Sequence, residues 1–156
     1  CSDKMQKCTI IFFDDKLKKE KTMKNLETKI NTQEEAIKFF IEKLDIEMID
    51  AFLDDCKTYQ DMQKRIFIAK LNRVFQTYKE TGDTYLVSYR GSCTSCYNGK
   101  KGYTFVGNKS GNYLSIIIDS EKGIVNDMFE CSSFANERTD IKLGVKLYID
   151  DFMSRF

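Results

Sequence analysis

Residues 84–131 read TYLVSYRGSCTSCYNGKKGYTFVGNKSGNYLSIIIDSEKGIVNDMFEC, and this stretch decides the fold. Short β-branched and aromatic runs alternate in it with clusters of glycine, asparagine and serine, a pattern that predicts strands joined by turns. We place the strands at residues 84–90, 102–106, 113–119 and 124–131. Because consecutive strands with short connections usually pair with each other, the stretch predicts an antiparallel meander.

Side chains alternate across a strand with a period of two. Tyr85, Val87 and Tyr89 are therefore expected on one face of the sheet, and Leu86 and Ser88 on the other. The apolar residues Ile116 and Ile118 need burial, so we expect the helices to cover their face.

Helical periodicity precedes the strands. Thr32 and Glu35 form a capping box that starts a helix, and a second helical stretch follows at residues 47–55. A third helix is predicted to start near Thr58 and to end at Gly82, which suits the left-handed position after a helix.

Three more segments complete the prediction. Residues 8–13 predict a short strand, and the charged residues 14–31 a mobile connection or a solvated helix. Asp140 is expected to cap a C-terminal helix, although Gly144 weakens it by about 1 kcal/mol. The predicted fold is a single α+β domain over residues 1–156. Its N-terminal helices pack on a twisted four- to five-stranded antiparallel sheet, with one further helix at the C-terminal end.

The composition excludes several activities. The chain has 156 residues with six cysteines and no histidine, so a Ser-His-Asp triad and a Cys-His dyad are excluded. Lys and Arg number 25 and Asp and Glu 24, which leaves a formal net charge of +1. That balance gives no electrostatic reason to expect nucleic acid or a membrane surface as a partner, although a local basic patch stays open.

Cys93 and Cys96 form the one motif that suggests chemistry. Two cysteines at this spacing suit a tetrahedral metal such as zinc, which needs two further ligands. Three interpretations stay open: thiols in a tight turn, a structural zinc site, and a redox-active disulfide. We expect an exposed loop between two strands here, because glycines flank a polar run.

The meander decides which cysteine is expected to join this pair. It places Cys131 at the other end of the sheet, about 20 Å from Cys93. Cys56 is the candidate third ligand, because a helix packed antiparallel on the first strand would start at the Cys93 end.

Tyr97, Tyr103 and Phe105 are the candidate binding residues. The run from Lys101 to Val106 partly resembles the strand motif of RNA-recognition modules, in which aromatic rings stack on bases. It departs from that motif at Thr104, and three predicted helices precede the sheet. We therefore interpret Tyr103 and Phe105 first as residues on one face of the sheet.

We expect a small non-catalytic bacterial binding or accessory protein, of which a partner-neutralising immunity protein is one form. The alternative is a small thiol- or metal-dependent enzyme that uses Cys93 and Cys96. The expected partner is another protein or a small ligand, and neither nucleic acid nor a membrane. The expected location is the cytoplasm with reduced thiols. The alternative is a bacterial lipoprotein with lipid on Cys1.

Overall fold

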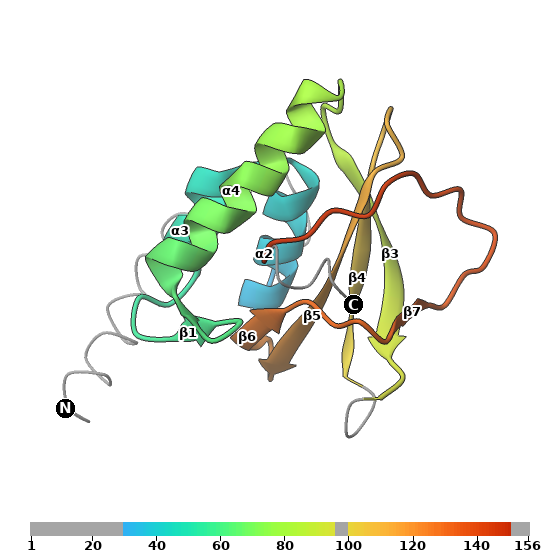
Figure 1. Ribbon diagram of the computed structural model, residues 1–156. Helices are drawn as coiled ribbons and strands as arrows, with labels where there is room; N and C mark the ends of the chain where they lie inside the picture. The colour runs from blue at the N-terminus through green and yellow to red at the C-terminus, as the bar shows by residue number, and fades with distance from the viewer. Residues whose placement is uncertain (1–29, 96–99, 151–156) are drawn as a thin grey trace.

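The computed structural model describes residues 30–95 and 100–150. The described helices are α2 (Gln33–Glu42), α3 (Ile46–Phe52) and α4 (Lys64–Glu80). The strands are β1 (Thr58–Tyr59), β2 (Met62–Gln63), β3 (Leu86–Cys93), β4 (Lys101–Gly107), β5 (Tyr113–Glu121), β6 (Ile124–Phe129) and β7 (Phe134–Asn136). The strand expected at residues 8–13 and nearly all of the connection at 14–31 lie outside these ranges. The predicted α+β class with an antiparallel sheet is confirmed (Figure 1).

Helix α2 begins where the capping box predicts. The Thr32 hydroxyl accepts a hydrogen bond from the backbone N–H of Glu35 at 3.2 Å. The Glu35 carboxylate in turn accepts from the backbone N–H of Asn31 at 3.0 Å. The first bond satisfies a backbone donor that the first helical turn leaves unpaired, and the second fixes the chain just before the N-cap. None of the described helices is long and apolar enough to cross a membrane.

The prediction that the third helix starts near Thr58 is wrong. Residues 58–63 form the antiparallel β1–β2 hairpin, and α4 starts only at Lys64. Gln60 and Asp61 occupy the turn with φ of 52° and 59°, left-handed values that a continuous helix cannot contain. Tyr59 is fully buried, and its hydroxyl accepts from the backbone N–H of Asp54 at 2.9 Å, which anchors the hairpin under α4.

The five-stranded sheet contains the predicted meander. The strand order is β6-β5-β4-β3-β7, and every adjacent pair is antiparallel. The fifth strand, β7, pairs with β3 on the side away from β4. The pairing places Val87 and Tyr89 on one face and Leu86 and Ser88 on the other, as predicted.

The three helices cover one face of this sheet (Figure 1). Ile116 and Ile118 point into the core on that face, 0% and 4% exposed, which confirms the prediction for them. Phe40 of α2, Phe52 of α3 and Phe67 of α4 belong to the same core. One hydrophobic core thus joins the helices to the meander.

The sheet is curved, as the connection after β6 shows. β6 and β7 occupy opposite edges, yet only residues 130–133 connect them. Four strand spacings in a flat sheet would need about 19 Å, whereas the five residue steps from Phe129 to Phe134 span at most about 17 Å. The chain therefore crosses from one edge to the other at a place where curvature brings the edges together.

The predicted C-terminal helix is absent from the described residues. Residues 137–150, here called the C-terminal segment, run as irregular chain past the β4–β5 turn (Figure 1). Tyr113 N donates to Val145 O at 3.0 Å, and Leu147 N donates to Tyr113 O at 2.7 Å. β6 pairs with β5 only from Ile117 onward. Tyr113, the first residue of β5, therefore finds a partner in this segment, which hydrogen-bonds there instead of forming a helix.

Candidate functional site

Two described thiols lie close together at the end of β3. Cys93 is buried, 2% exposed, and its Sγ lies 2.9 Å from the Sγ of the half-buried Cys131. Cys96 and Tyr97 lie outside the described residues. Cys93 is a strand residue and not part of an exposed loop, which corrects the prediction at that position.

The prediction that Cys131 stands far from Cys93 is wrong. It assumed that Cys131 ends the fourth strand of a flat meander. In the structure β6 ends at Phe129, and Cys131 lies in the connection that crosses to β7. Because β7 pairs with the end of β3, the connection brings Cys131 to Cys93 without any change in the strand order.

Hydrogen bonds fix the chain on both sides of this thiol pair. Thr94 donates to Ser133 O through its backbone N–H at 3.1 Å and through its hydroxyl at 3.0 Å. The Ser95 and Ser133 hydroxyls bond to each other at 2.9 Å. Cys93 is also in register with Phe134 of β7. The two sulfurs are therefore held together by the surrounding backbone.

Cys56, the candidate third ligand, is engaged in a disulfide. It lies in the connection between α3 and β1. Cys56 is disulfide-bonded to a residue outside the described ranges, so the expectation of reduced thiols fails at this position. Over residues 30–95 and 100–150, no three Asp, Glu, Cys or His side chains are placed to hold a metal ion.

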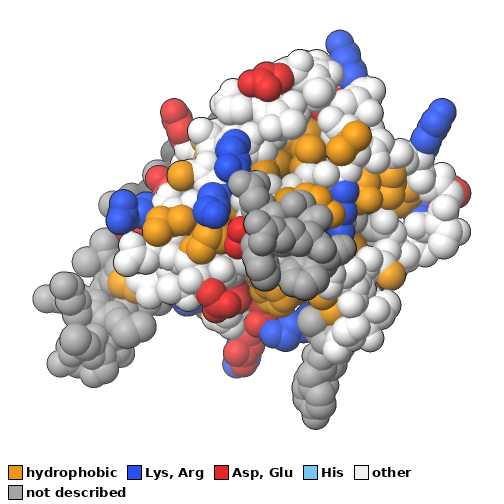
Figure 2. All heavy atoms as spheres, in the orientation of Figure 1, with side chains coloured by type: hydrophobic (Ala, Val, Ile, Leu, Met, Phe, Trp, Pro, Cys, Tyr) orange, Lys and Arg blue, Asp and Glu red, His pale blue; other side chains and the backbone are white. Residues whose placement is uncertain are grey.

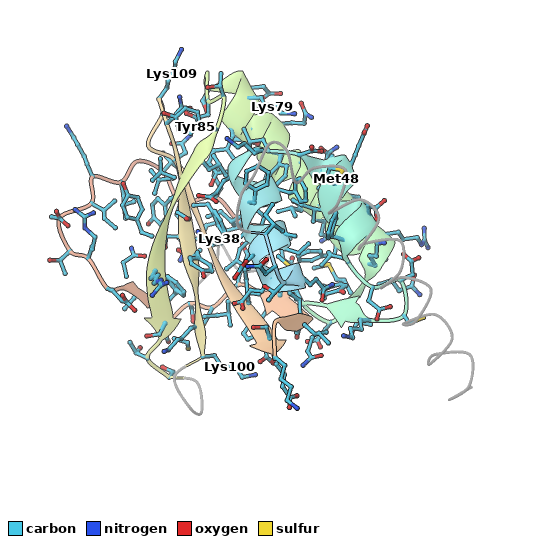
Figure 3. All side chains as sticks on the ribbon, turned by 180° about the vertical axis from the view of Figure 1, so that it is seen from behind. Lys38, Met48, Lys79, Tyr85, Lys100 and Lys109 are labelled. Atoms are coloured by element: carbon cyan, nitrogen blue, oxygen red, sulfur yellow. The ribbon has the colours of Figure 1, made fainter. Side chains whose placement is uncertain are left out.

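The two described aromatic candidates differ in accessibility. Phe105 is fully buried in the core under the helices, so its ring does not reach a ligand. Tyr103 is half-buried, and the Lys38 ammonium lies 5.3 Å from its ring centroid. Figure 3 shows Lys38 between α2 and the sheet. Tyr103 is thus the one described aromatic candidate that borders a cavity.

That cavity is small and of mixed charge. Its volume is about 140 Å³, and it is lined by Glu34, Arg90, Gly91, Lys101, Gly102, Tyr103 and Glu137. Burial raises the pKa of Tyr103, and the Glu34 carboxylate raises it further, so the hydroxyl stays protonated at neutral pH. The cavity has room for a few water molecules or a small polar group.

A larger hollow of about 420 Å³ lies between α3 and the start of α4. It is lined by Asp50, Asp55, Cys56, Lys57, Thr58, Gln63, Lys64 and Arg65. The Lys64 ammonium forms ion pairs with Asp50 at 3.1 Å and with Asp55. Because these opposite charges already compensate each other, the hollow offers little net charge to a ligand.

The outer surface of α4 carries a regular exposed row. Its members share one side of the helix at spacings of three, four and one residues, and we call them the α4 stripe: Arg65, Ile66, Ala69, Arg73 and Gln76. Ile66 is 39% exposed although it is a large apolar side chain. Figure 2 shows Lys and Arg side chains over α4 with hydrophobic side chains between them.

Charge is segregated among the helices. α4 contains five basic residues and one acidic residue, a formal charge of +4. α2 and α3 together contain five acidic residues and one basic residue, a formal charge of −4. A chain with a net charge of +1 therefore presents a basic helix, which is the local basic patch that the composition left open.

Gln60 and Glu130 tie the β1–β2 hairpin to the chain that follows β6, a connection that was not predicted. The Gln60 side chain donates to Glu130 Oε2 at 3.0 Å and accepts from Glu130 N at 3.1 Å. Asp127 accepts from Gln60 N at 3.0 Å. A lone polar residue in a short apolar run is the only available signal, and it does not identify a partner 70 residues away.

Comparison with known proteins found no matching protein-family model, no matching curated protein and no matching solved structure. The candidate sites therefore rest on the geometry of the chain itself.

Proposed function

We propose that the chain is a non-catalytic binding protein whose α4 stripe receives an acidic surface of a protein partner, in an accessory or partner-neutralising role. The observation that carries this proposal is the exposed row in which Arg65 and Arg73 flank Ile66 and Ala69. Arginine side chains around apolar ones are typical of the energetic centres of protein interfaces. The helix also supplies a rigid frame of 17 residues for them.

The cavities favour a protein over a small organic ligand. Pockets for such ligands usually measure about 300–1,000 Å³ and are mainly apolar. The cavity at Tyr103 has only about 140 Å³. The hollow at Cys56 reaches about 420 Å³ but is lined mostly by charged and polar side chains.

The chemistry of the stripe favours an acidic protein over nucleic acid. Nucleic-acid surfaces take many Lys and Arg side chains onto phosphates. Here Lys64 is paired with Asp50 and Asp55, and Lys70 lies 3.8 Å from Asp150. This pairing reduces the charge offered beside the stripe, and an apolar Ile66 has no counterpart on a phosphate backbone.

Two further observations belong to this proposal. The burial of Cys93 counts against the alternative of a thiol-dependent enzyme, since catalytic thiols are partly exposed. The disulfide at Cys56 favours an oxidising compartment over the cytoplasm.

Affinity capture from an extract of the cells that produce the protein tests the proposal. The wild type is compared with R65E/R73E, which reverses two charges of the stripe. The matched control is K122E/K142E, which reverses two exposed lysines in the β5–β6 turn and in the C-terminal segment. Circular dichroism checks that all three proteins are folded.

We expect the wild type and the control to capture an acidic protein that salt releases. The amount captured by R65E/R73E should be at least tenfold lower. Three outcomes would overturn it: equal capture by both double variants, a captured species that nuclease removes, and no specific capture by the wild type.

A further inference from the structure

We propose that Cys93 and Cys131 form a reversible oxidation site, in which the two thiols become a disulfide by exchange with a small disulfide such as oxidised glutathione. The proposal does not depend on the α4 stripe. It assigns the redox partner of Cys93 to a cysteine 38 residues away in the sequence and not to Cys96 of the same short motif.

The distance between the sulfurs is the first argument. The two Sγ atoms lie 2.9 Å apart and share a hydrogen bond in which either sulfur can be the donor. A disulfide has a sulfur–sulfur bond of about 2.05 Å, so the atoms need to approach by less than about 1 Å.

The rigidity of the surroundings is the second argument. Thr94 and Ser133, which follow the two cysteines, are joined by two hydrogen bonds of 3.1 and 3.0 Å to the Ser133 carbonyl. The pairing of Cys93 with Phe134 continues the ladder between β3 and β7. A thiolate fixed beside a mixed disulfide on its neighbour attacks that disulfide at a high effective concentration.

Their unequal burial decides the order of the steps. Cys131 is half-buried, and Cys93 is only 2% exposed. The Cys131 thiolate therefore attacks one sulfur of oxidised glutathione, whose disulfide bond breaks and releases one glutathione thiolate. Cys93 then loses its proton and attacks Cys131 Sγ, which breaks the mixed disulfide and releases the second glutathione. Two protein thiols are oxidised, one glutathione disulfide is reduced, and the two protons end on the two glutathione molecules.

Peptide mapping of the whole protein tests this assignment. The protein is equilibrated in buffers of increasing oxidised-to-reduced glutathione ratio, quenched with acid, alkylated and digested with trypsin. Cleavage after lysine and arginine gives peptide 91–100, which contains Cys93 and Cys96, and peptide 123–138, which contains Cys131. Cys56 falls in the separate peptide 44–57, so a link that involves Cys56 has a different mass from the link between peptides 91–100 and 123–138.

The expected product is peptide 91–100 linked to peptide 123–138, with fragment ions that place the link on Cys93. In the C96S variant the link should persist, and in C93S it should be lost. An internal disulfide in peptide 91–100, a link that survives in C93S, a stable glutathione adduct on Cys131, or full alkylation of both thiols at the highest ratio would each overturn the proposal. Because the wild type alone gives the linkage, the test stands even if a variant fails to fold.

Discussion

The backbone N–H of Ile149 donates a hydrogen bond of 2.6 Å to Glu130 Oε1, which fastens the C-terminal segment to the chain that leaves β6. The second carboxylate oxygen accepts from Asp150 N at 3.1 Å and from the Gln60 side chain at 3.0 Å. Glu130 is only 9% exposed. One buried carboxylate therefore joins the C-terminal segment and the β1–β2 hairpin.

Replacing Glu130 by alanine should lower the free energy of unfolding by about 2–4 kcal/mol, because three donors lose their acceptor in a buried place. E130Q keeps one carbonyl oxygen as an acceptor and should lower the free energy of unfolding by less. Urea denaturation measures both. The exposed Glu121 supplies the control, since E121A should change the value by less than about 0.5 kcal/mol. Equal effects of E130A and E121A would contradict the role given to Glu130.

Glu130 should also give stability a defined pH dependence. Burial raises its pKa above the ordinary value of 4.5, against the hydrogen bonds from Gln60, Ile149 and Asp150, which lower it. A carboxyl with a raised folded-state pKa holds its proton more tightly in the folded protein. Its contribution is therefore complete below pH 4.5 and is lost as the pH rises through the raised pKa. The unfolding free energy of the wild type minus that of E130Q should fall across this window, and a constant difference would refute the argument.

Asp83 should produce the opposite slope. Burial raises its pKa, but hydrogen bonds from the Ser110 hydroxyl and the N–H groups of Ser110 and Lys109 outweigh that effect, and the pKa lies below the ordinary 3.8. Its contribution is present above pH 3.8 and is lost as the pH falls through the lowered pKa. D83N should cost about 1–3 kcal/mol at neutral pH. The difference in unfolding free energy between D83N and the wild type should shrink as the pH is lowered in a series of denaturation measurements. If the difference grows instead, the lowered pKa of Asp83 is wrong.

Gly102 should tolerate no side chain. A Cβ there would lie 2.0 Å from Ile116 O, a backbone atom of the neighbouring strand that cannot move away alone. G102A should lower the free energy of unfolding by about 3 kcal/mol or more. At Gly82 a Cβ meets only Lys109 Cδ at 3.9 Å, but φ is +93°, so G82A should cost about 1 kcal/mol. Thermal denaturation ranks the two variants, and the reverse order would disprove the steric argument.

The Cys56 disulfide should stabilise the fold. C56S is expected to lower the free energy of unfolding by about 2–4 kcal/mol, since the crosslink restricts the unfolded chain. The measurement is best made in a C131S background, where the Cys93–Cys131 pair does not contribute. A reducing agent should bring the C131S protein down to the stability of C56S/C131S and leave the latter unchanged. No effect of the reductant on C131S would count against the crosslink.

The meander could be predicted because every signal for it is local. Alternation in residues 86–89 and the apolar run at 116–118 fix which face is buried, and the turn residues fix the strand ends. The start of α4 could not be predicted in this way. Gln60 and Asp61 take left-handed backbone without glycine. Tertiary hydrogen bonds from Gln60 to Asp127 of β6 and to Glu130 just after β6 hold the turn in place.

The difference between local signals and tertiary contacts also explains the wrong predictions for Cys131 and for the C-terminal segment. Cys131 was expected at the far end because sequence spacing describes a flat sheet, whereas sheet curvature and β7 decide its position. The C-terminal segment has helical spacing of apolar residues, but its backbone finds partners on β5. The α4 stripe does follow helical periodicity, so its spacing was available from sequence once the helix was placed correctly at Lys64–Glu80.

Residues 134–147 are synthesised after the strands with which they pair, and this order affects the chain during synthesis. These residues supply the neighbour of β3 on one side and of Tyr113, the first residue of β5, on the other. While the chain leaves the ribosome, the meander emerges first and presents both backbone edges before their partners have been synthesised. Unpaired edges of this kind recruit strands from other chains. The nascent protein should therefore be most prone to aggregate in the short interval between the completion of β6 and the emergence of residue 147.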